Sequence, residues 1–268
     1  MLKKIAARYR YSSILLRQLV ITDFKLRYQG SVLGYMWSLL RPLAIFVILY
    51  IVFTRFLRIG DNIPHYPVYL LLGIVLWNFF VEVTTGSVGV VVSKGDLMRK
   101  INFPKYVIIF AGSIAALINL FLNLLVVLLF MFLNGVDFRI AGLWFPLLVV
   151  ELFIFSMAIG FFLSAAFVRF RDIGYIWEVF TQAAFYATPI LYPLALVPVR
   201  YARLLILNPL AQIIQDSRYV LVSDQTLTID SLYSNQFIRL VPLAIVFVSV
   251  IISIVYFRSR SRFFAEEV

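Results

Sequence analysis

The sequence contains no cysteine and a single histidine, so the commonest protein ligands for transition metals are nearly absent. We therefore expect no disulfide framework, no thiol chemistry and no metal site at His65. The phosphate-binding pattern Gly-x-x-x-x-Gly-Lys-Ser/Thr is also missing, so the chain is not expected to bind ATP in a P-loop. No nucleophile with a partner base and no pocket-forming pair of carboxylates can be recognised. The sequence thus predicts neither catalysis nor a bound cofactor.

Charge is scarce as well. Only 14% of the 268 residues are charged, whereas 63% are apolar and the mean hydropathy is +0.96. A soluble domain could not keep so much apolar surface from water, which indicates an integral membrane protein. The net charge of +11 would suggest nucleic acid in a soluble protein, but here the basic residues flank apolar runs. Basic flanks contact anionic lipid headgroups and orient spans, so no nucleic-acid partner is expected.

Six apolar runs are each close to the twenty or so residues that a helix needs to cross a bilayer. They lie at about 32–57, 68–92, 106–133, 143–168, 173–194 and 237–257. The predicted fold is an all-α integral membrane protein with six transmembrane helices. The fifth run is interrupted by Pro189 and Pro193, so neighbouring helices or water must satisfy the backbone groups that these prolines free.

Basic residues are distributed unevenly between the two sides of this arrangement. With the amino terminus inside, sixteen lysines and arginines are internal and seven are external, and all six lysines are internal. Since positive charge is retained on the cytoplasmic side, we expect both termini in the cytoplasm. The predicted parts are an N-terminal segment 1–31 without signal-peptide layout, one transmembrane domain 32–257 and a cytoplasmic tail 258–268. Within 1–31, Ile14, Leu15, Leu19 and Phe24 predict an interfacial helix with its apolar stripe in lipid.

The longest segment between spans, 195–236, is more apolar than an ordinary outer loop. It predicts two short helices, joined at Asn208–Pro209, that dip back toward the membrane, although helices lying flat above the bilayer remain an alternative. No internal repeat is visible, which disfavours a secondary transporter built from inverted repeats.

Charged and polar residues inside the spans are the candidates for a channel wall, because a charge at the bilayer centre costs about 2.5–3.5 kcal/mol. Arg41 and Glu82 both fall about 15 Å from the inner boundary, so they could pair or bind an anionic substrate. A purely structural ion pair is an equally good interpretation. Mid-span aromatic rings could stack on sugars, although packing is the alternative for any single ring. The predicted channel residues are Arg41, Tyr50, Phe53, Trp77, Asn78, Glu82, Thr85, Glu178, Gln182 and Phe185.

The internal loop 93–105 combines apolar side chains with basic ones and ends at Pro104–Lys105. This pattern predicts a short helix that docks into a cleft of a soluble partner. A helix lying on lipid headgroups is the competing interpretation.

Four stretches in order resemble the permease subunits of type-2 ABC exporters, in the branch that moves lipid-linked polysaccharides. They are Asp23 to Pro42, Ser93 to Lys105, Arg169 to Gly174 and Thr188 to Pro193. The resemblance implies a homodimer in the bacterial cytoplasmic membrane, with two copies of a separate ATPase subunit that bind ATP and magnesium. It implies export of an undecaprenyl-linked polysaccharide such as O-antigen.

The same resemblance assigns roles to two groups of residues. The lipid headgroup would enter beside Lys25, Arg27 and Tyr28. Coupling to the ATPase would involve Gly95, Asp96, Leu97, Met98, Arg99, Ile101 and Phe103. Alternatives within the class are exporters of teichoic acid, capsule, small lipid or drug. From other classes, a secondary transporter or a non-transporting membrane scaffold would have no partner ATPase.

Overall fold

The computed structural model describes residues 13–22, 25, 34–58, 63–100, 103–261 and 264. Within these ranges every regular element is a helix. Five segments are long and apolar enough to cross a membrane. They are Trp37–Phe56, Tyr66–Val88, Tyr106–Leu133, Ile140–Arg169 and Gln236–Arg260. The predicted all-α membrane fold is confirmed, and the chain is a multi-pass membrane protein.

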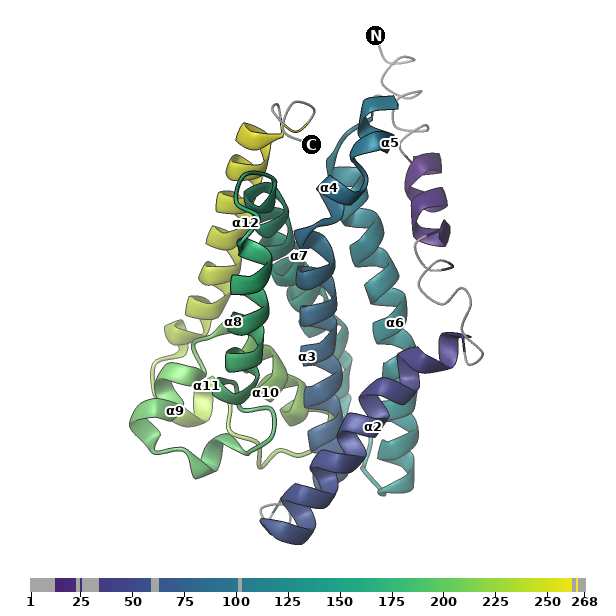
Figure 1. Cartoon of the computed structure of the whole chain (residues 1–268). Coiled ribbons are helices and arrows are strands. Elements are labelled where there is room, and N and C mark those ends of the chain that lie inside the picture. The colour runs from purple at the N-terminus through teal and green to yellow at the C-terminus, as the bar shows by residue number, and fades with distance from the viewer. Residues whose placement is uncertain are drawn as a thin grey trace.

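The helices follow one another along the chain with short connections (Figure 1). The α-helices are α2 (Trp37–Ile51), α3 (Tyr66–Val88), α4 (Val90–Ser93), α5 (Gly95–Lys100), α6 (Tyr106–Leu133), α7 (Phe145–Arg169), α8 (Ile173–Ala187), α9 (Val199–Leu205), α10 (Pro209–Leu221), α11 (Ile229–Leu232) and α12 (Leu240–Arg260). Shorter turns are the 3₁₀-helices η1 (Gly34–Met36), η4 (Ile140–Trp144), η5 (Leu194–Leu196) and η6 (Gln236–Arg239), and the π-helix η2 (Val52–Phe56).

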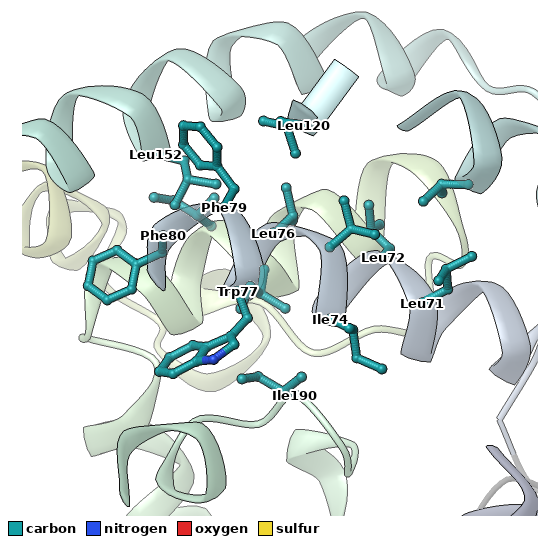
Figure 2. Packing of buried hydrophobic residues seen from close by; sticks show 14 of the residues in the cluster. Leu71, Leu72, Ile74, Leu76, Trp77, Phe79, Phe80, Leu120, Leu152 and Ile190 are labelled. Atoms are coloured by element: carbon teal, nitrogen blue, oxygen red, sulfur yellow. The ribbon is translucent and has the colours of Figure 1, made fainter. Parts of the chain in front are cut away.

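Helix α3 is the centre of the bundle. Its sequence is apolar on all sides, which is typical of a helix buried all round. Figure 2 shows Leu72, Leu76 and Phe79 of α3 among side chains from other elements, including Leu120 of α6 and Leu152 of α7. Because lipid is as apolar as these side chains, their packing depends on close contact rather than on escape from water.

Close contact between α3 and α7 depends on small residues. A Cβ added at Gly160 of α7 would lie 2.7 Å from Ser87 Oγ of α3, closer than real Cβ atoms come. Ser87 in turn donates its hydroxyl hydrogen to the carbonyl of Val83 in its own helix, at 2.7 Å. The two backbones therefore approach as near as their smallest side chains allow, as is usual for helices packed in membranes.

Helix α8 is shorter than the predicted span 173–194. It has 15 residues, a rise of about 22 Å, against about 30 Å for the hydrocarbon core. The helix ends at Ala187 because Pro189 disfavours helical backbone at the residue before it, and Thr188 adopts extended dihedrals. Residues 188–192 then form turns. The break that the prolines predict is present, but it removes about the last third of the expected helix.

Residues 195–236 form the predicted short helices, with the chain turning at Asn208–Pro209 between α9 and α10. The Asn208 side chain accepts a hydrogen bond from the Leu210 amide at 3.0 Å, which caps α10, and Pro209 occupies its first turn. Leu210, Ile213 and Ile214 are buried, and α10 packs against α3, α7 and α12. Helix α10 therefore enters the bundle, whereas α9 and α11 lie at the end opposite α4 and α5 (Figure 1).

The N-terminal helix differs from its prediction. Helix 13–22 does not place its whole apolar stripe in lipid, because Leu15, Leu16 and Leu19 pack against a cluster around Phe103 and Val107. Ile14 is exposed. Phe24 lies outside the described residues.

Candidate functional site

One side of α8 packs on the bundle and the other is uncovered. On the packed side, Trp177 Nε1 donates to Thr84 Oγ1 of α3 at 3.2 Å, and the Trp177 ring stacks on Phe180. On the other side, Glu178 and Gln182 are exposed. They lie one helical turn apart, about 7 and 13 Å from the first residue of α8. Helix α8 thus carries a carboxylate and an amide on an open surface within the membrane-length bundle.

Large apolar and aromatic side chains share this open surface of α8. Tyr175, Ile176, Val179 and Tyr186 are all exposed, with Val179 at 67%. Rings and polar groups therefore alternate along one uncovered strip, which we call the α8 face (residues 175, 176, 178, 179, 182 and 186).

The other predicted channel residues divide into three groups by exposure. Arg41 of α2 and Thr85 of α3 are exposed like Glu178 and Gln182. Half-buried residues are Tyr50, Phe53, Asn78, Glu82 and Phe185. Trp77 is only 4% exposed and packs against Phe80 and Phe185, so within one protomer it is a core residue and not part of an open wall.

Arg41 and Glu82 do not pair with each other. A Glu82 carboxylate oxygen accepts a hydrogen bond from Asn119 Nδ2 of α6 at 2.9 Å. Among the described residues, ion pairs join Arg139 to Asp224 and Arg239 to Asp230, both at the end that carries α9 and α11. An Arg41–Glu82 ion pair is not among those of the described residues, and an α3–α6 hydrogen bond contributes to holding the acid, while an anionic substrate beside Arg41 stays a prediction.

A buried arginine organises the region where α8 ends. Arg218 of α10 is fully buried, although its position in the sequence suggested an outer loop. Its Nη1 and Nη2 donate to the carbonyls of Pro189 and Ile190, each at 2.6 Å. Its Nε donates to the Tyr69 carbonyl of α3 at 3.0 Å, and its guanidinium lies 3.6 Å from the centre of the Tyr69 ring. One side chain thus joins α10, α3 and the turn after α8.

One of the acceptors of Arg218 is a carbonyl that a proline frees. Pro193 has no N–H, so the carbonyl four residues earlier, at Pro189, has no helical donor. Arg218 supplies that donor, and the Tyr66 hydroxyl supplies another to the Leu191 carbonyl at 3.0 Å. The expectation that neighbouring helices satisfy this backbone is confirmed for the Pro189 carbonyl, and the carbonyls of Ile190 and Leu191 beside it also accept hydrogen bonds from other helices.

Room for the guanidinium depends on a glycine of α3. A Cβ at Gly73 would lie 2.4 Å from Arg218 Nη2. Sequence reasoning missed Arg218, Gly73 and Tyr69. The available signal was the pair of prolines, which demanded a donor from elsewhere in the chain, but nothing local to Arg218 identified it as that donor.

The loop 93–105 contains the predicted short helix, α5, preceded by the single turn α4. Asp96 is exposed, whereas Gly95 is buried. Phe103 is also buried, under Leu15 and Leu19, so it packs inside the protomer and is not presented to a partner. The side chains of Leu97, Met98 and Arg99, and residue Ile101, lie outside the described part. So do Arg27 and Tyr28, whereas Lys25 is exposed.

The C-terminal tail contacts this same end of the bundle. Lys105 Nζ donates to the Ser261 carbonyl and lies 5.4 Å from the ring centre of Phe264, which is fully buried. Partial burial lowers the pKa of the Lys105 ammonium from its usual value. We call α4, α5 and residues 103–105 the foot.

Several membrane-length helices and a polar, uncovered face within them define a polytopic membrane transport component. Comparison with known proteins gives its family. The chain matches the ABC-2 type transporter family over residues 14–222, more than half of its length, and it belongs to that family.

Three curated relatives agree with this assignment. An O-antigen export system permease protein (RfbA) of Myxococcus xanthus is 30% identical over 219 residues, covering 80% of this chain and 82% of that protein. The protein of the same name from Klebsiella pneumoniae is 29% identical over 193 residues, covering 72% and 74%. The polysialic acid transport protein KpsM of Escherichia coli is 24% identical over 213 residues, covering 78% and 82%.

Proposed function

We propose that this chain is the permease subunit of an ATP-driven exporter of a lipid-linked polysaccharide such as O-antigen. The observation that carries the proposal is the α8 face. Glu178 and Gln182 are exposed in the protomer at a depth where lipid contact costs a carboxylate about 2.5–3.5 kcal/mol. Such a face needs water or polar substrate beside it. The names of the relatives, which are permeases for O-antigen and polysialic acid, support a glycan as that substrate.

The conduit would form between two copies of this chain. A single bundle whose central helix is buried on all sides leaves no passage through its own core. Two copies facing each other along α8 and α2 would enclose Glu178, Gln182, Arg41 and Thr85 in one polar passage. The exposed rings Tyr175, Phe180 and Tyr186 would offer flat faces on which sugar rings stack.

Energy would come from a separate ATPase. This sequence has no P-loop, so ATP and magnesium would be bound by two copies of the partner subunit. The foot is the proposed docking region, because α5 is a short helix with Asp96 and Lys100 exposed, at the end that carries most of the basic residues. With the foot on the cytoplasmic side, both termini would lie in the cytoplasm and the protein in the bacterial inner membrane. Lys25, Arg27 and Tyr28 would meet the pyrophosphate headgroup there.

The proposal can be tested by export assays in cells that lack the chromosomal copy of this gene. Glu178→Leu with Gln182→Leu should reduce surface glycan by tenfold or more and leave lipid-linked glycan inside the cell. The amount of folded protein should not change, because both side chains are exposed. Leu125→Gln with Leu129→Gln on α6 is a control for altered polarity on a helix surface.

Co-purification of the tagged chain distinguishes the alternatives. A P-loop protein should elute with the wild type and be lost when Asp96 is changed to Lys. Recovery without any P-loop protein, together with unchanged glycan at the surface, would favour a secondary transporter or a scaffold. Export of a small lipid with no glycan would indicate the other substrate classes of the family.

A further inference from the structure

The lipid-facing side of the bundle has two apolar grooves of nearly equal size. The first, about 430 Å³, lies between α6, α7 and α12 and is lined by residues that include Phe110, Met157, Phe161, Val250, Ile254 and Arg258. The second, about 400 Å³, lies between α6 and the start of α7 and includes Phe121, Leu125, Leu128, Met131, Phe145 and Leu221. Only the first has a charged residue in its lining.

The first groove has the length of one lipid leaflet. It follows α12 from Arg258 to Val250, eight residues or about 12 Å. Half of the hydrocarbon core is about 15 Å thick. Arg258 lies in the last turn of α12, at the same end as the foot, so the charged mouth is at the membrane surface and the apolar part runs toward the bilayer centre.

The chemistry of the groove wall selects an acyl chain. Ser253 is the one small hydroxyl in the lining, and it already donates to the Val250 carbonyl at 2.9 Å. The remaining wall of the apolar part is aliphatic and aromatic. Apart from the Tyr106 hydroxyl, a polar ligand would find few donors or acceptors in this lining, whereas a hydrocarbon chain can contact every lining side chain.

The mouth of the groove selects a negative headgroup. Within the described part of the chain, the Arg258 guanidinium makes no ion pair, and it is exposed. Arg260 lies two residues further along α12, and its guanidinium is 5.9 Å from the centre of the Tyr256 ring. The guanidinium of Arg258 at the end of an apolar groove matches the phosphate of a phospholipid, since arginine binds phosphate in a planar, bidentate manner.

We propose that the groove between α6, α7 and α12 is a binding site for an anionic glycerophospholipid of the leaflet on the foot side. One acyl chain lies between Ile254 and Phe110, and the phosphate contacts Arg258. This site is separate from the α8 face, and it does not depend on the proposed export function. The lipid would cover the contact between α12 and α7.

The test measures lipid binding to the purified full-length chain by native mass spectrometry, with phosphatidylglycerol and phosphatidylethanolamine as probes. Arg258→Gln should weaken phosphatidylglycerol binding about fivefold and leave phosphatidylethanolamine nearly unchanged, because one arginine near the surface accounts for a factor of that order. Arg258→Lys keeps the charge and should keep most of the preference.

Groove filling supplies the second arm. Ile254→Trp should reduce binding of both lipids, whereas Leu125→Trp, which adds the same bulk to the uncharged groove, should leave the phosphatidylglycerol preference intact. Both isoleucine and leucine are partly exposed, so the larger ring can be accommodated.

Three results would overturn the proposal. The first is phosphatidylglycerol binding that is unaffected by Arg258→Gln or by Ile254→Trp. The second is disulfide formation between two copies that carry Ile254→Cys in membranes, which would show a second protein chain in the groove. The third is a polyprenyl phosphate that displaces phosphatidylglycerol from the wild type but not from Ile254→Trp, which would assign the groove to the transported lipid.

Discussion

At the scale of single residues, the buried side chain of Arg218 joins three parts of the chain through its hydrogen bonds: α10, α3 and the turn after α8. A guanidinium buried among apolar helices is costly unless hydrogen bonds and favourable dipoles compensate it. Here the carbonyls of Pro189 and Ile190 follow the C-terminal end of α8, where the helix dipole is negative. The planar fork of arginine reaches these carbonyls and that of Tyr69 together, which no other side chain could do.

Replacing this arginine tests its role directly. Arg218→Leu leaves the carbonyls of Pro189 and Ile190 without this donor and removes a third hydrogen bond from the Tyr69 carbonyl, and each such loss costs about 1–3 kcal/mol. We expect a loss of at least about 3 kcal/mol in the free energy of unfolding, measured by thermal or denaturant unfolding in detergent micelles. The free energy of unfolding of Arg218→Lys should lie between those of the wild type and Arg218→Leu, because one ammonium group cannot donate to all three carbonyls.

Arg200→Leu is the control for this experiment, since Arg200 is exposed on α9. An equal effect of Arg200→Leu and Arg218→Leu would contradict the assignment.

The second prediction at this scale concerns the space beside the guanidinium. Gly73→Ala places a methyl group where Arg218 Nη2 lies, so we expect destabilisation of about 1–3 kcal/mol from overpacking. Gly112→Ala on α6 meets no atom within 4 Å and should be neutral or slightly stabilising. The melting temperatures of Gly73→Ala and Gly112→Ala, measured under the same conditions, show whether the added methyl group at Gly73 destabilises the protein. A neutral Gly73→Ala would show that the guanidinium can move aside.

Sequence reasoning succeeded unevenly at this scale. Glu178 and Gln182, both predicted as channel residues, are four residues apart and are both exposed on α8, since helical periodicity is a local property. The partner of Glu82 was wrongly inferred, because two residues at equal depth can still point in different directions. Arg218 was missed because its acceptors lie about 30 and 150 residues away in the chain, and no local pattern encodes such contacts.

At the scale of helices, the spans themselves were predictable and their ends were not. Length and hydropathy identified the segments around α3, α6, α7 and α12, because lipid requires long helices with internally satisfied backbones. The proline pair predicted that the fifth span is broken, but not that α8 would end at Ala187. Pro189 ends the helix locally, and the carbonyls of the following turn accept hydrogen bonds from Arg218 and Tyr66, which lie far away in the chain.

The contact between α3 and α7 offers a test of helix packing. Gly160→Ala brings a Cβ to 2.7 Å from Ser87 Oγ and 3.1 Å from Ser87 Cβ, so the helices must separate. We expect a loss of about 1–3 kcal/mol in unfolding free energy. Adding Ser87→Gly removes both close contacts and should restore most of the loss.

Gly86→Ala, one position away on α3, meets nothing within 4 Å and serves as the matched control. A double variant no more stable than Gly160→Ala alone would argue against a direct contact between these two positions. Unfolding in detergent of the wild type, Gly160→Ala, Ser87→Gly and the double variant gives the coupling energy between the two positions.

At the scale of the whole molecule, the exposed α8 face calls for a second copy. The natural absence of cysteine makes this easy to examine, because single cysteines can be introduced without first removing others. Val179→Cys and Tyr186→Cys should form disulfide-linked dimers in oxidised membranes when two α8 faces meet. Leu129→Cys, exposed on α6, should remain monomeric. Cross-linking through Leu129 alone would place the interface on another side of the bundle.

The general architecture of the molecule followed from composition alone, whereas its assembly did not. An apolar chain with basic flanks has few folds available to it in a bilayer, and the helical bundle is one of them. The insertion of α10 among α3, α7 and α12 is different, because its apolar residues would have suited an interfacial helix equally well. The position of α10 inside the bundle depends on the hydrogen bonds of Arg218 to residues far away in the sequence, which a local sequence pattern does not encode.

The arrangement around Arg218 also bears on how the protein is made. Its three acceptors, in α3 and in the turn after α8, all precede it in the chain. During synthesis those segments emerge from the ribosome and enter the bilayer before α10 does. The guanidinium therefore enters a membrane that already holds its hydrogen-bond acceptors. If α10 preceded these segments in the chain, its arginine would enter the hydrocarbon without them.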